Sequence, residues 1–284
     1  MVNKGIFMEK KLRITIPAEI YKIIESDLED FGITKNYLCN YIFENSEGFK
    51  QIYNYKYGNV KKIIQFNLNK KNRENYYSFL AEKNIEVEAE YFRNIFLHYA
   101  QKSKKSREFF IFKDIIGKLG LAIDNKKKII VTFADESSKT ISPYYIASSE
   151  LELKNYLFSY DEEEKKFKNF SIRNIKSVYI TGKNVYDEEM GYVKNVIENF
   201  DPFLSYNKTV TVRFTDEGLE LLKNLKTYRP KVLEKNGNIY KFQCSQLLGK
   251  RYFSNFWNEA EILEPQELRN WFREKSQKIS LLYK

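Results

Sequence analysis

Two short runs of alternating apolar and polar residues carry side chains that can hydrogen-bond to nucleic-acid bases. The runs are Leu12–Ile16 and Ile64–Leu68. Because Arg, Gln and Asn can each make two hydrogen bonds to a base edge, a paired ribbon with these residues on one face fits a DNA major groove. The alternative is the solvated face of an ordinary hairpin. The candidate contacts are Arg13, Thr15, Gln65 and Asn67.

The second run carries no Lys or Arg on that face between Ile64 and Leu68, so we expect it to be the more structural of the two. A basic segment further along the chain offers cations for phosphate groups, although such a segment is equally typical of a solvated helix end. Its candidate phosphate contacts are Lys102, Lys104, Lys105 and Arg107.

Residue types for catalysis are sparse. His98 is the only histidine and has no nearby nucleophile in the sequence, and the two cysteines, Cys39 and Cys244, lie far apart. No glycine-rich phosphate loop and no metal-ligand spacing occur. The sequence therefore predicts a binding protein rather than an enzyme, with no catalytic residue, no metal and no cofactor.

The charge balance favours a polyanionic partner. The 284 residues carry a formal net charge of +10, which suits nucleic acid, although a compositional bias toward Lys, Asn and Ile would produce the same excess. No apolar run is long enough to span a membrane and no signal peptide is visible. We expect a cytoplasmic protein with no membrane partner.

The alternating runs belong to an internal repeat. In each copy a strand, a helix, a tight turn and a second helix follow one another, and Asn84 stands where the first copy has Gly32. The agreement of order, phase and cap predicts one repeated unit. Each copy resembles a ribbon-helix-helix motif, which implies that residues 1–101 form a pseudo-dimer through antiparallel pairing of the two strands.

Residues 128–182 read as short strands with tight turns, a pattern typical of a small β-barrel. The segments Asn155-Tyr156-Leu157 and Phe170–Ile175 resemble the WYL domain. That resemblance implies an Sm-like barrel that binds a nucleotide or nucleic-acid ligand. Its ligand face would be formed by Tyr145, Tyr156, Ser171, Arg173 and Asn174.

Three further segments complete a multidomain α+β chain. Residues 102–127 read as a connecting helix, with the apolar repeat over Glu108–Leu121, and residues 183–207 as a linker helix. Residues 208–284 resemble the C-terminal extension that accompanies WYL domains, which implies a ferredoxin-like α+β module and a homodimer. Its apolar tail is expected to dock on its own core or on a partner chain.

The order of these modules resembles the WYL accessory proteins of type VI CRISPR systems. The resemblance implies single-stranded RNA binding, in preference to duplex DNA, and stimulation of an RNA-guided CRISPR effector ribonuclease. Two alternatives stay open. One is a DNA-binding transcriptional regulator with a ligand-sensing WYL domain, and the other is a protein-interaction scaffold whose charge is compositional.

Overall fold

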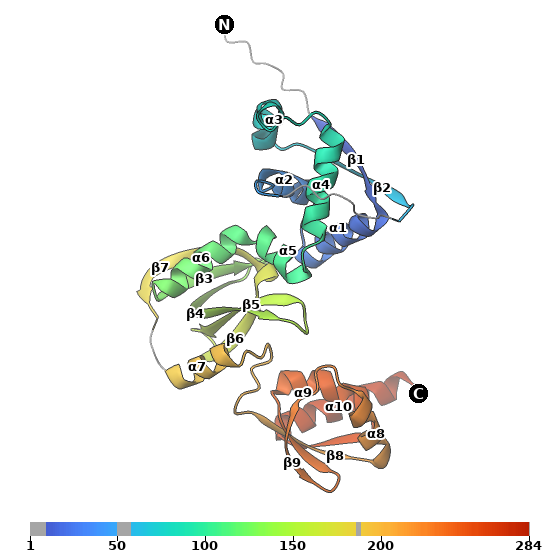
Figure 1. The fold of residues 1–284 in the computed structure, drawn as a ribbon. Helices are drawn as coiled ribbons and strands as arrows, with labels where there is room; N and C mark the ends of the chain where they lie inside the picture. The colour runs from blue at the N-terminus through green and yellow to red at the C-terminus, as the bar shows by residue number, and fades with distance from the viewer. Residues whose placement is uncertain (1–9, 50–57, 186–188, 284) are drawn as a thin grey trace. The chain divides into compact units, whose positions relative to one another are not determined.

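A computed structural model describes residues 10–49, 58–185 and 189–283 (Figure 1). The chain divides into two compact units. The first comprises residues 1–118 together with 133–135 and 172–177, and the second comprises 119–132, 136–171 and 178–284. The finer division into five segments stays a prediction.

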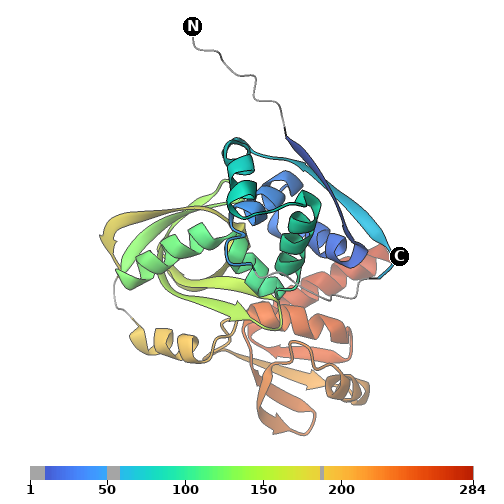
Figure 2. The ribbon, with the colours of Figure 1, turned by 45° about the horizontal axis from the view of Figure 1, so that its top comes forward.

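The first unit contains the strand–helix–helix order twice. The elements of this repeat are β1 (Lys11–Pro17), α1 (Ala18–Phe31), α2 (Lys35–Glu44), β2 (Lys61–Asn67), α3 (Lys70–Glu82) and α4 (Glu88–Ala100). The predicted antiparallel pairing of the two strands is confirmed, and Figure 2 shows β1 and β2 running side by side along their whole length.

Both copies end their first helix in the same way. Gly32 and Asn84 adopt left-handed conformations with φ of 63° and 51°. The N–H of Ile33 then donates to the carbonyl oxygen of Leu28 at 3.1 Å, and the N–H of Ile85 donates to that of Leu80 at 2.9 Å. This closure satisfies carbonyl groups that the helix end leaves open, so the predicted equivalence of Gly32 and Asn84 is confirmed.

The segment that was expected to be one connecting helix is two helices. They are α5 (Lys104–Ile111) and α6 (Lys113–Asp124). Phe112 lies between the two helices and ends α5, with φ −98° and ψ 21°. Helical spacing of the apolar residues continues across this break, which is why the sequence pattern alone did not reveal it.

The middle of the chain forms a five-stranded sheet in the order β6-β5-β4-β3-β7. Its strands are β3 (Lys127–Phe133), β4 (Ser138–Ser149), β5 (Lys154–Asp161), β6 (Lys166–Ser171) and β7 (Ile175–Asn184). The residues from Phe167 to Ile180 read in the sequence as a single strand-like run, but the structure divides them. A 3₁₀ turn, η1 (Ile172–Asn174), separates β6 from β7, because β6 lies at one edge of the sheet and β7 at the other.

The C-terminal part forms a four-stranded antiparallel sheet in the order β11-β8-β10-β9. Helices α8, α9 and α10 contribute Leu222, Leu248 and Leu268 to its core. The sequence Asn236-Gly237, a strong signal for a β-hairpin, lies at the turn between β9 and β10. The elements of this region are α7 (Met190–Glu198), β8 (Thr209–Phe214), α8 (Asp216–Asn224), β9 (Lys231–Asn236), β10 (Ile239–Gln243), α9 (Gln246–Phe253), η2 (Ser254–Phe256), β11 (Ala260–Glu264) and α10 (Gln266–Leu282).

The last helix, α10, continues to Leu282, and its end does not dock on the core of its own unit. Leu281 and Leu282 are 68% and 79% exposed. Within the described ranges, no helix combines the length and apolar character needed to cross a membrane.

Candidate nucleic-acid interface

The exposed face of the β1–β2 ribbon gathers polar side chains from both copies of the repeat. Arg13 lies directly opposite Gln65, Lys11 opposite Asn67, and Thr15 opposite Ile63. All six are exposed, whereas the alternate residues from Leu12 to Ile16 and from Ile64 to Leu68 are buried. We call these six residues, together with Lys61 at the end of β2, the ribbon face.

The buried side of the ribbon holds it in place. Helices α1 and α4 pack against it, and Leu12, Ile14, Ile64 and Phe66 are at most 4% exposed. Burial of such side chains contributes about 1.5–3 kcal/mol each. The ladder also extends beyond the strands, because the N–H of Leu68 donates to the carbonyl oxygen of Lys10 at 2.9 Å. The ribbon face is therefore a rigid platform.

A buried amide fixes the end of the ribbon. Asn40 of α2 is 2% exposed. Its Nδ2 donates to the carbonyl oxygen of Asn67, and its Oδ1 accepts from the N–H of Asn69, both at 2.8 Å. The N–H of Asn67 donates to Oδ1 of Asn36 at 2.8 Å. Both backbone groups of Asn67 are thus satisfied within the protein, and its exposed side chain projects from a fixed position.

The ribbon face carries three cations, Lys11, Arg13 and Lys61. Neither Lys11 nor Arg13 forms an ion pair with any residue that the structure describes. Unpaired guanidinium and ammonium groups beside amide and hydroxyl side chains can bind phosphate oxygens and base edges.

Two members of this surface were missed by reasoning from the sequence. The second strand begins at Lys61 rather than at Ile64, so Lys61 and Ile63 share the face of Gln65. The expectation that the second copy supplies no cation to this face was therefore wrong. Alternation continues back to Lys61, and this was the signal that could have revealed it.

The basic segment near α5 is largely committed to contacts within the first unit. The side chain of Arg107 donates to both carboxylate oxygens of Asp27, at 2.6 and 2.9 Å, and Arg107 is only 8% exposed. Lys104 pairs with Asp30, and the Lys102 ammonium lies 5.6 Å from the ring centre of Phe49. Lys105 is half-buried and also has a partner. This corrects the expected set of phosphate contacts, because Arg107 faces the core.

Arg173 has a structural environment rather than an open one. Its Nε donates to Oε1 of Glu108 at 2.7 Å. The Arg173 side chain is 8% exposed and that of Glu108 is fully buried. The guanidinium also lies 5.3 Å from the ring centre of Phe31. The expectation that Arg173 faces a ligand is corrected accordingly, since its charge is neutralised inside the first unit.

The other four residues of the expected ligand face divide into two groups. Tyr156 lies opposite Ser171 on neighbouring strands, and the Tyr156 hydroxyl donates to the carboxylate of Glu152. Both are largely buried, and Oγ of Ser171 has no partner among the described residues. Tyr145 and Asn174 are exposed. The structure therefore brings Tyr156 and Ser171 together, but it does not assemble the five residues into a pocket.

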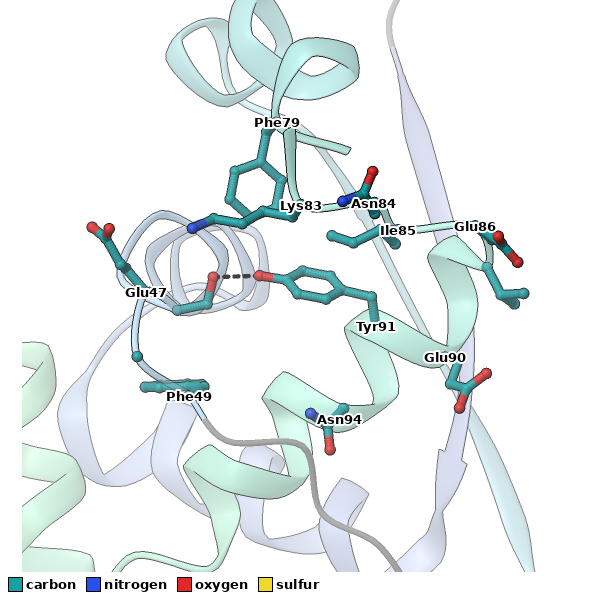
Figure 3. Close-up of a pocket in the computed structure, with 13 residues that line it drawn as sticks. Glu47, Phe49, Phe79, Lys83, Asn84, Ile85, Glu86, Glu90, Tyr91 and Asn94 are labelled. Atoms are coloured by element: carbon teal, nitrogen blue, oxygen red, sulfur yellow. Dashed lines mark hydrogen bonds between the residues drawn. The ribbon is translucent and has the colours of Figure 1, made fainter. Parts of the chain in front are cut away.

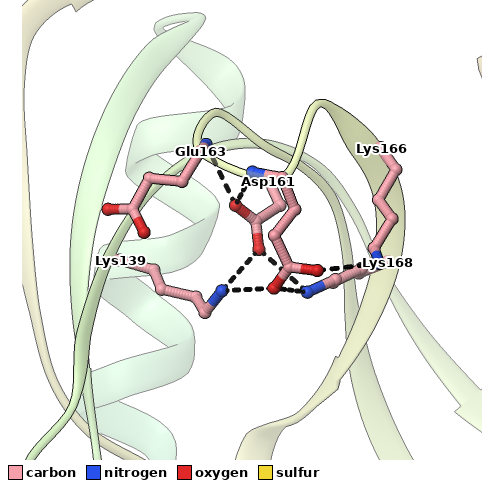
Figure 4. A network of polar contacts seen from close by, with 6 residues as sticks. Lys139, Asp161, Glu163, Lys166 and Lys168 are labelled. Atoms are coloured by element: carbon pink, nitrogen blue, oxygen red, sulfur yellow. Dashed lines mark hydrogen bonds and ion pairs between the residues drawn. The ribbon is translucent and has the colours of Figure 1, made fainter.

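The turn between β5 and β6 also uses its lysines internally (Figure 4). Lys139 and Lys168 donate to the buried carboxylate of Asp161 at 2.8 and 3.0 Å, and Lys166 pairs with Glu164 at 2.7 Å. Burial alone would raise the pKa of Asp161, but the hydrogen bonds from Lys139, the backbone and Lys168 outweigh it and lower the pKa to about 2. These cations are consequently a poor source of phosphate contacts.

A pocket of about 460 Å³ opens beside the turn between α3 and α4 (Figure 3). Glu47, Glu86 and Glu90 line it with one lysine, Lys83. The Ser46 and Tyr91 hydroxyls are hydrogen-bonded at 2.7 Å. Three carboxylates would repel a polyanion, so this pocket is not a candidate for nucleic acid.

The histidine and the two cysteines pack within the protein. The ring of His98 stacks on that of Phe49 with 4.2 Å between centres, and burial followed by the Lys102 charge lowers the pKa of His98. Burial raises the pKa of the Cys39 and Cys244 thiols to about 12. Among the described residues, no group of three or more His, Cys, Asp and Glu side chains is placed to hold a metal ion.

Comparisons with known proteins give a fold relationship. A crystal structure of a CRISPR Cas-related protein matches 97% of this chain and 94% of its own, with a TM-score of 0.67 and 16% identity. The proteasome accessory factor B/C of Arthrobacter aurescens matches 96% of this chain and 50% of its own at 12% identity, but its TM-score of 0.31 is too low to support an argument. No family model and no curated protein matches the sequence. The chain therefore shares the fold of the first of these structures along nearly its whole length.

Proposed function

We propose that this chain is a nucleic-acid-binding accessory protein of a CRISPR system, and that it binds nucleic acid through the ribbon face. The observation that carries the proposal is the pair of exposed cations, Lys11 and Arg13, set among hydrogen-bonding side chains on a rigid antiparallel ladder. The likeness over 97% of the chain to a CRISPR Cas-related protein supports the accessory role.

The proposal includes finer assignments of the modules. The repeated strand–helix–helix order with paired strands supports a ribbon-helix-helix pseudo-dimer. A five-stranded sheet whose last strand is reached through a 3₁₀ turn supports an Sm-like WYL domain. The four-stranded sheet with its helices supports a ferredoxin-like C-terminal module through which two chains form a homodimer.

Single-stranded RNA is the preferred ligand in this proposal, and stimulation of an RNA-guided ribonuclease is the preferred role. The major groove of duplex RNA is too deep and narrow for side chains to read, so an RNA ligand of the ribbon face would be unpaired. Backbone contacts from Lys11, Arg13 and Lys61 would supply a salt-dependent affinity with little dependence on sequence.

Duplex DNA is the second candidate, and one specific observation favours it. Arg13 and Gln65 lie directly opposite each other at the middle of the ribbon. Both side chains can form paired hydrogen bonds to base edges in a major groove of about 12 Å width, which admits a two-stranded ribbon. This candidate predicts a preferred sequence, whereas the RNA candidate does not.

A fluorescence-anisotropy titration tests the proposal. Labelled single-stranded RNA and a DNA duplex, both of mixed sequence, would be compared at near-physiological salt, because low salt promotes non-specific binding of both. We expect K11A/R13A to weaken RNA binding at least tenfold. A matched control, K194A/K223A, removes two exposed lysine charges outside the first unit and should leave the affinity within about twofold.

If K11A/R13A and K194A/K223A lose the same amount of RNA affinity, the loss reflects only the lower net charge, and this result would contradict a ribbon interface. Weak binding of the wild type to either nucleic acid would instead favour the scaffold alternative. The accessory role requires a separate assay, in which the protein is added to an RNA-guided ribonuclease and the cleavage rate is measured. We expect the rate to rise with the wild type and to rise less with K11A/R13A.

A further inference from the structure

The two halves of the ribbon face are related by an internal two-fold axis whose position follows from the pairing register. Equivalent residues of the two copies are 52 positions apart, as in Gly32 and Asn84, while paired residues of β1 and β2 have numbers that add to 78. Only Arg13 and Gln65 satisfy both conditions. This pair therefore lies on the axis, at the centre of the ribbon face.

The axis relates the pair Lys11–Asn67 on one side of the centre to the pair Thr15–Ile63 on the other side. Lys11 is equivalent to Ile63, and Thr15 is equivalent to Asn67. The half from the first copy presents Lys11, Arg13 and Thr15, and the half from the second copy presents Ile63, Gln65 and Asn67. Within two residues of the axis the first copy therefore has two positive charges and the second has none, and Lys61 of the second copy lies further out, opposite Pro17. Ile63 is 45% exposed and places an apolar side chain among the polar ones of the ribbon face.

The two halves of the ribbon face carry different side chains, so they should contact different bases. A symmetric dimer places identical side chains on both sides of its axis and therefore matches a palindromic site. Here the backbone is nearly two-fold symmetric but the side chains are not. Arg pairs with guanine, Gln and Asn pair with adenine, and an apolar group contacts the methyl of thymine.

We infer that the ribbon face reads a non-palindromic sequence in duplex DNA and binds it in one orientation only. Arg13 contacts a guanine and Gln65 an adenine at the centre of the site, Ile63 covers a thymine methyl, and Lys11 contacts a phosphate. The inference rests on the proposed function in one respect, since the ribbon face must be a nucleic-acid interface. It develops the second candidate ligand, duplex DNA, and adds that the recognised sequence is asymmetric.

The test is selection from a randomised DNA-duplex library with the full chain at near-physiological salt. We expect an enriched motif that differs from its reverse complement. The decisive variant is R13Q/Q65R, which exchanges the two side chains on the axis and leaves the net charge unchanged. Because both residues are exposed, the variant should keep the wild-type melting temperature.

The exchanged variant should move the guanine preference to the symmetry-related base on the other strand and leave the flanking preferences in place. Its affinity for the wild-type site should fall roughly five- to hundredfold, the range for loss of one good base contact. K194A/K223A should enrich the wild-type motif. A palindromic motif, or the same motif for R13Q/Q65R and the wild type, would overturn the inference.

The failures of the two proposals can be told apart. If no duplex is enriched while single-stranded RNA is bound and K11A/R13A weakens that binding, the inference falls and the proposed function stands. If the chain binds neither nucleic acid at near-physiological salt, both fall.

Discussion

Arg13 and Arg173 carry the same guanidinium group in opposite surroundings. Arg13 is exposed on the ribbon face, whereas Arg173 is almost fully buried against Glu108. The sequence analysis predicted that both arginines contact a ligand. Residue type and strand periodicity show that a side chain could form such a contact, but they do not show which group it binds in the folded protein. Glu108 is 65 residues away in the chain, and only the folded structure brings its carboxylate to Arg173.

Substitution of Arg173 by alanine should therefore affect stability more than binding. Removing one partner of a buried ion pair leaves an uncompensated charge and typically costs about 3–5 kcal/mol. We expect R173A to lower the free energy of unfolding in urea by about 3 kcal/mol, while its folded fraction binds RNA as the wild type does. If R173A keeps the wild-type stability but loses RNA affinity tenfold, Arg173 contacts the ligand and this account of its role is wrong.

Acid should weaken the turn between β5 and β6 through Asp161. Its pKa is about 2 in the folded protein and close to 3.9 in an unfolded chain. A carboxylate with a depressed folded pKa stabilises the protein above about pH 4, and this contribution is lost as the pH falls toward 2. After allowance for solvent screening we expect about 1–2 kcal/mol.

Urea unfolding of D161N and the wild type at pH 7 and pH 3 measures this contribution. The difference in unfolding free energy between the two proteins should be larger at pH 7 than at pH 3. The same difference at both pH values would mean that Asp161 is not held by its lysine neighbours.

The helices and strands of the repeat are specified mainly by local sequence, as the caps of its helices show. The sequence predicted the repeat, its strand pairing and its left-handed caps, because these depend on local pattern and on glycine or asparagine at one position. It did not predict the break at Phe112 or the turn η1. Both depend on where distant strands and charged partners lie, and a local pattern does not carry that information.

Substitutions at glycines test the cap. Gly32 has φ of 63° and open space where a Cβ would stand, so G32A changes only the backbone preference and should cost about 1 kcal/mol. Gly117 lies inside α6 with equally open space and no positive φ, so G117A should stabilise by about 0.5–1 kcal/mol. Thermal melts should move in opposite directions. A stabilising G32A would contradict the cap.

At the scale of the whole molecule, the location of unpaired charge matters more than the total of +10. Lysines and arginines near α5 and in the turn between β5 and β6 are engaged by carboxylates, while Lys11 and Arg13 are not paired within the described residues. Composition predicted a basic protein, but it could not say which cations remain available. Seven of the thirteen residues predicted to contact ligand or phosphate are at least partly buried, and for Arg107 and Arg173 the reason is an ion pair.

The exposed end of α10 tests the proposed homodimer. Leu281 and Leu282 present apolar surface beyond the core of their own unit, and such surface is typical of an interface. We expect L281E/L282E to shift the full chain toward monomer in light scattering coupled to size exclusion, with an unchanged melting profile of the C-terminal module. An unchanged dimer, or a wild type that is already monomeric, would contradict this assignment.

The salt dependence of RNA binding tests the ribbon interface most directly. Each phosphate contact on a single strand contributes about 0.7 to the slope of log K against log salt. For K11A/R13A we predict a slope shallower than that of the wild type by about 1.4, and for K194A/K223A an unchanged slope. If K11A/R13A retains the wild-type slope and affinity, nucleic acid does not bind at the ribbon face, and the proposed interface is wrong.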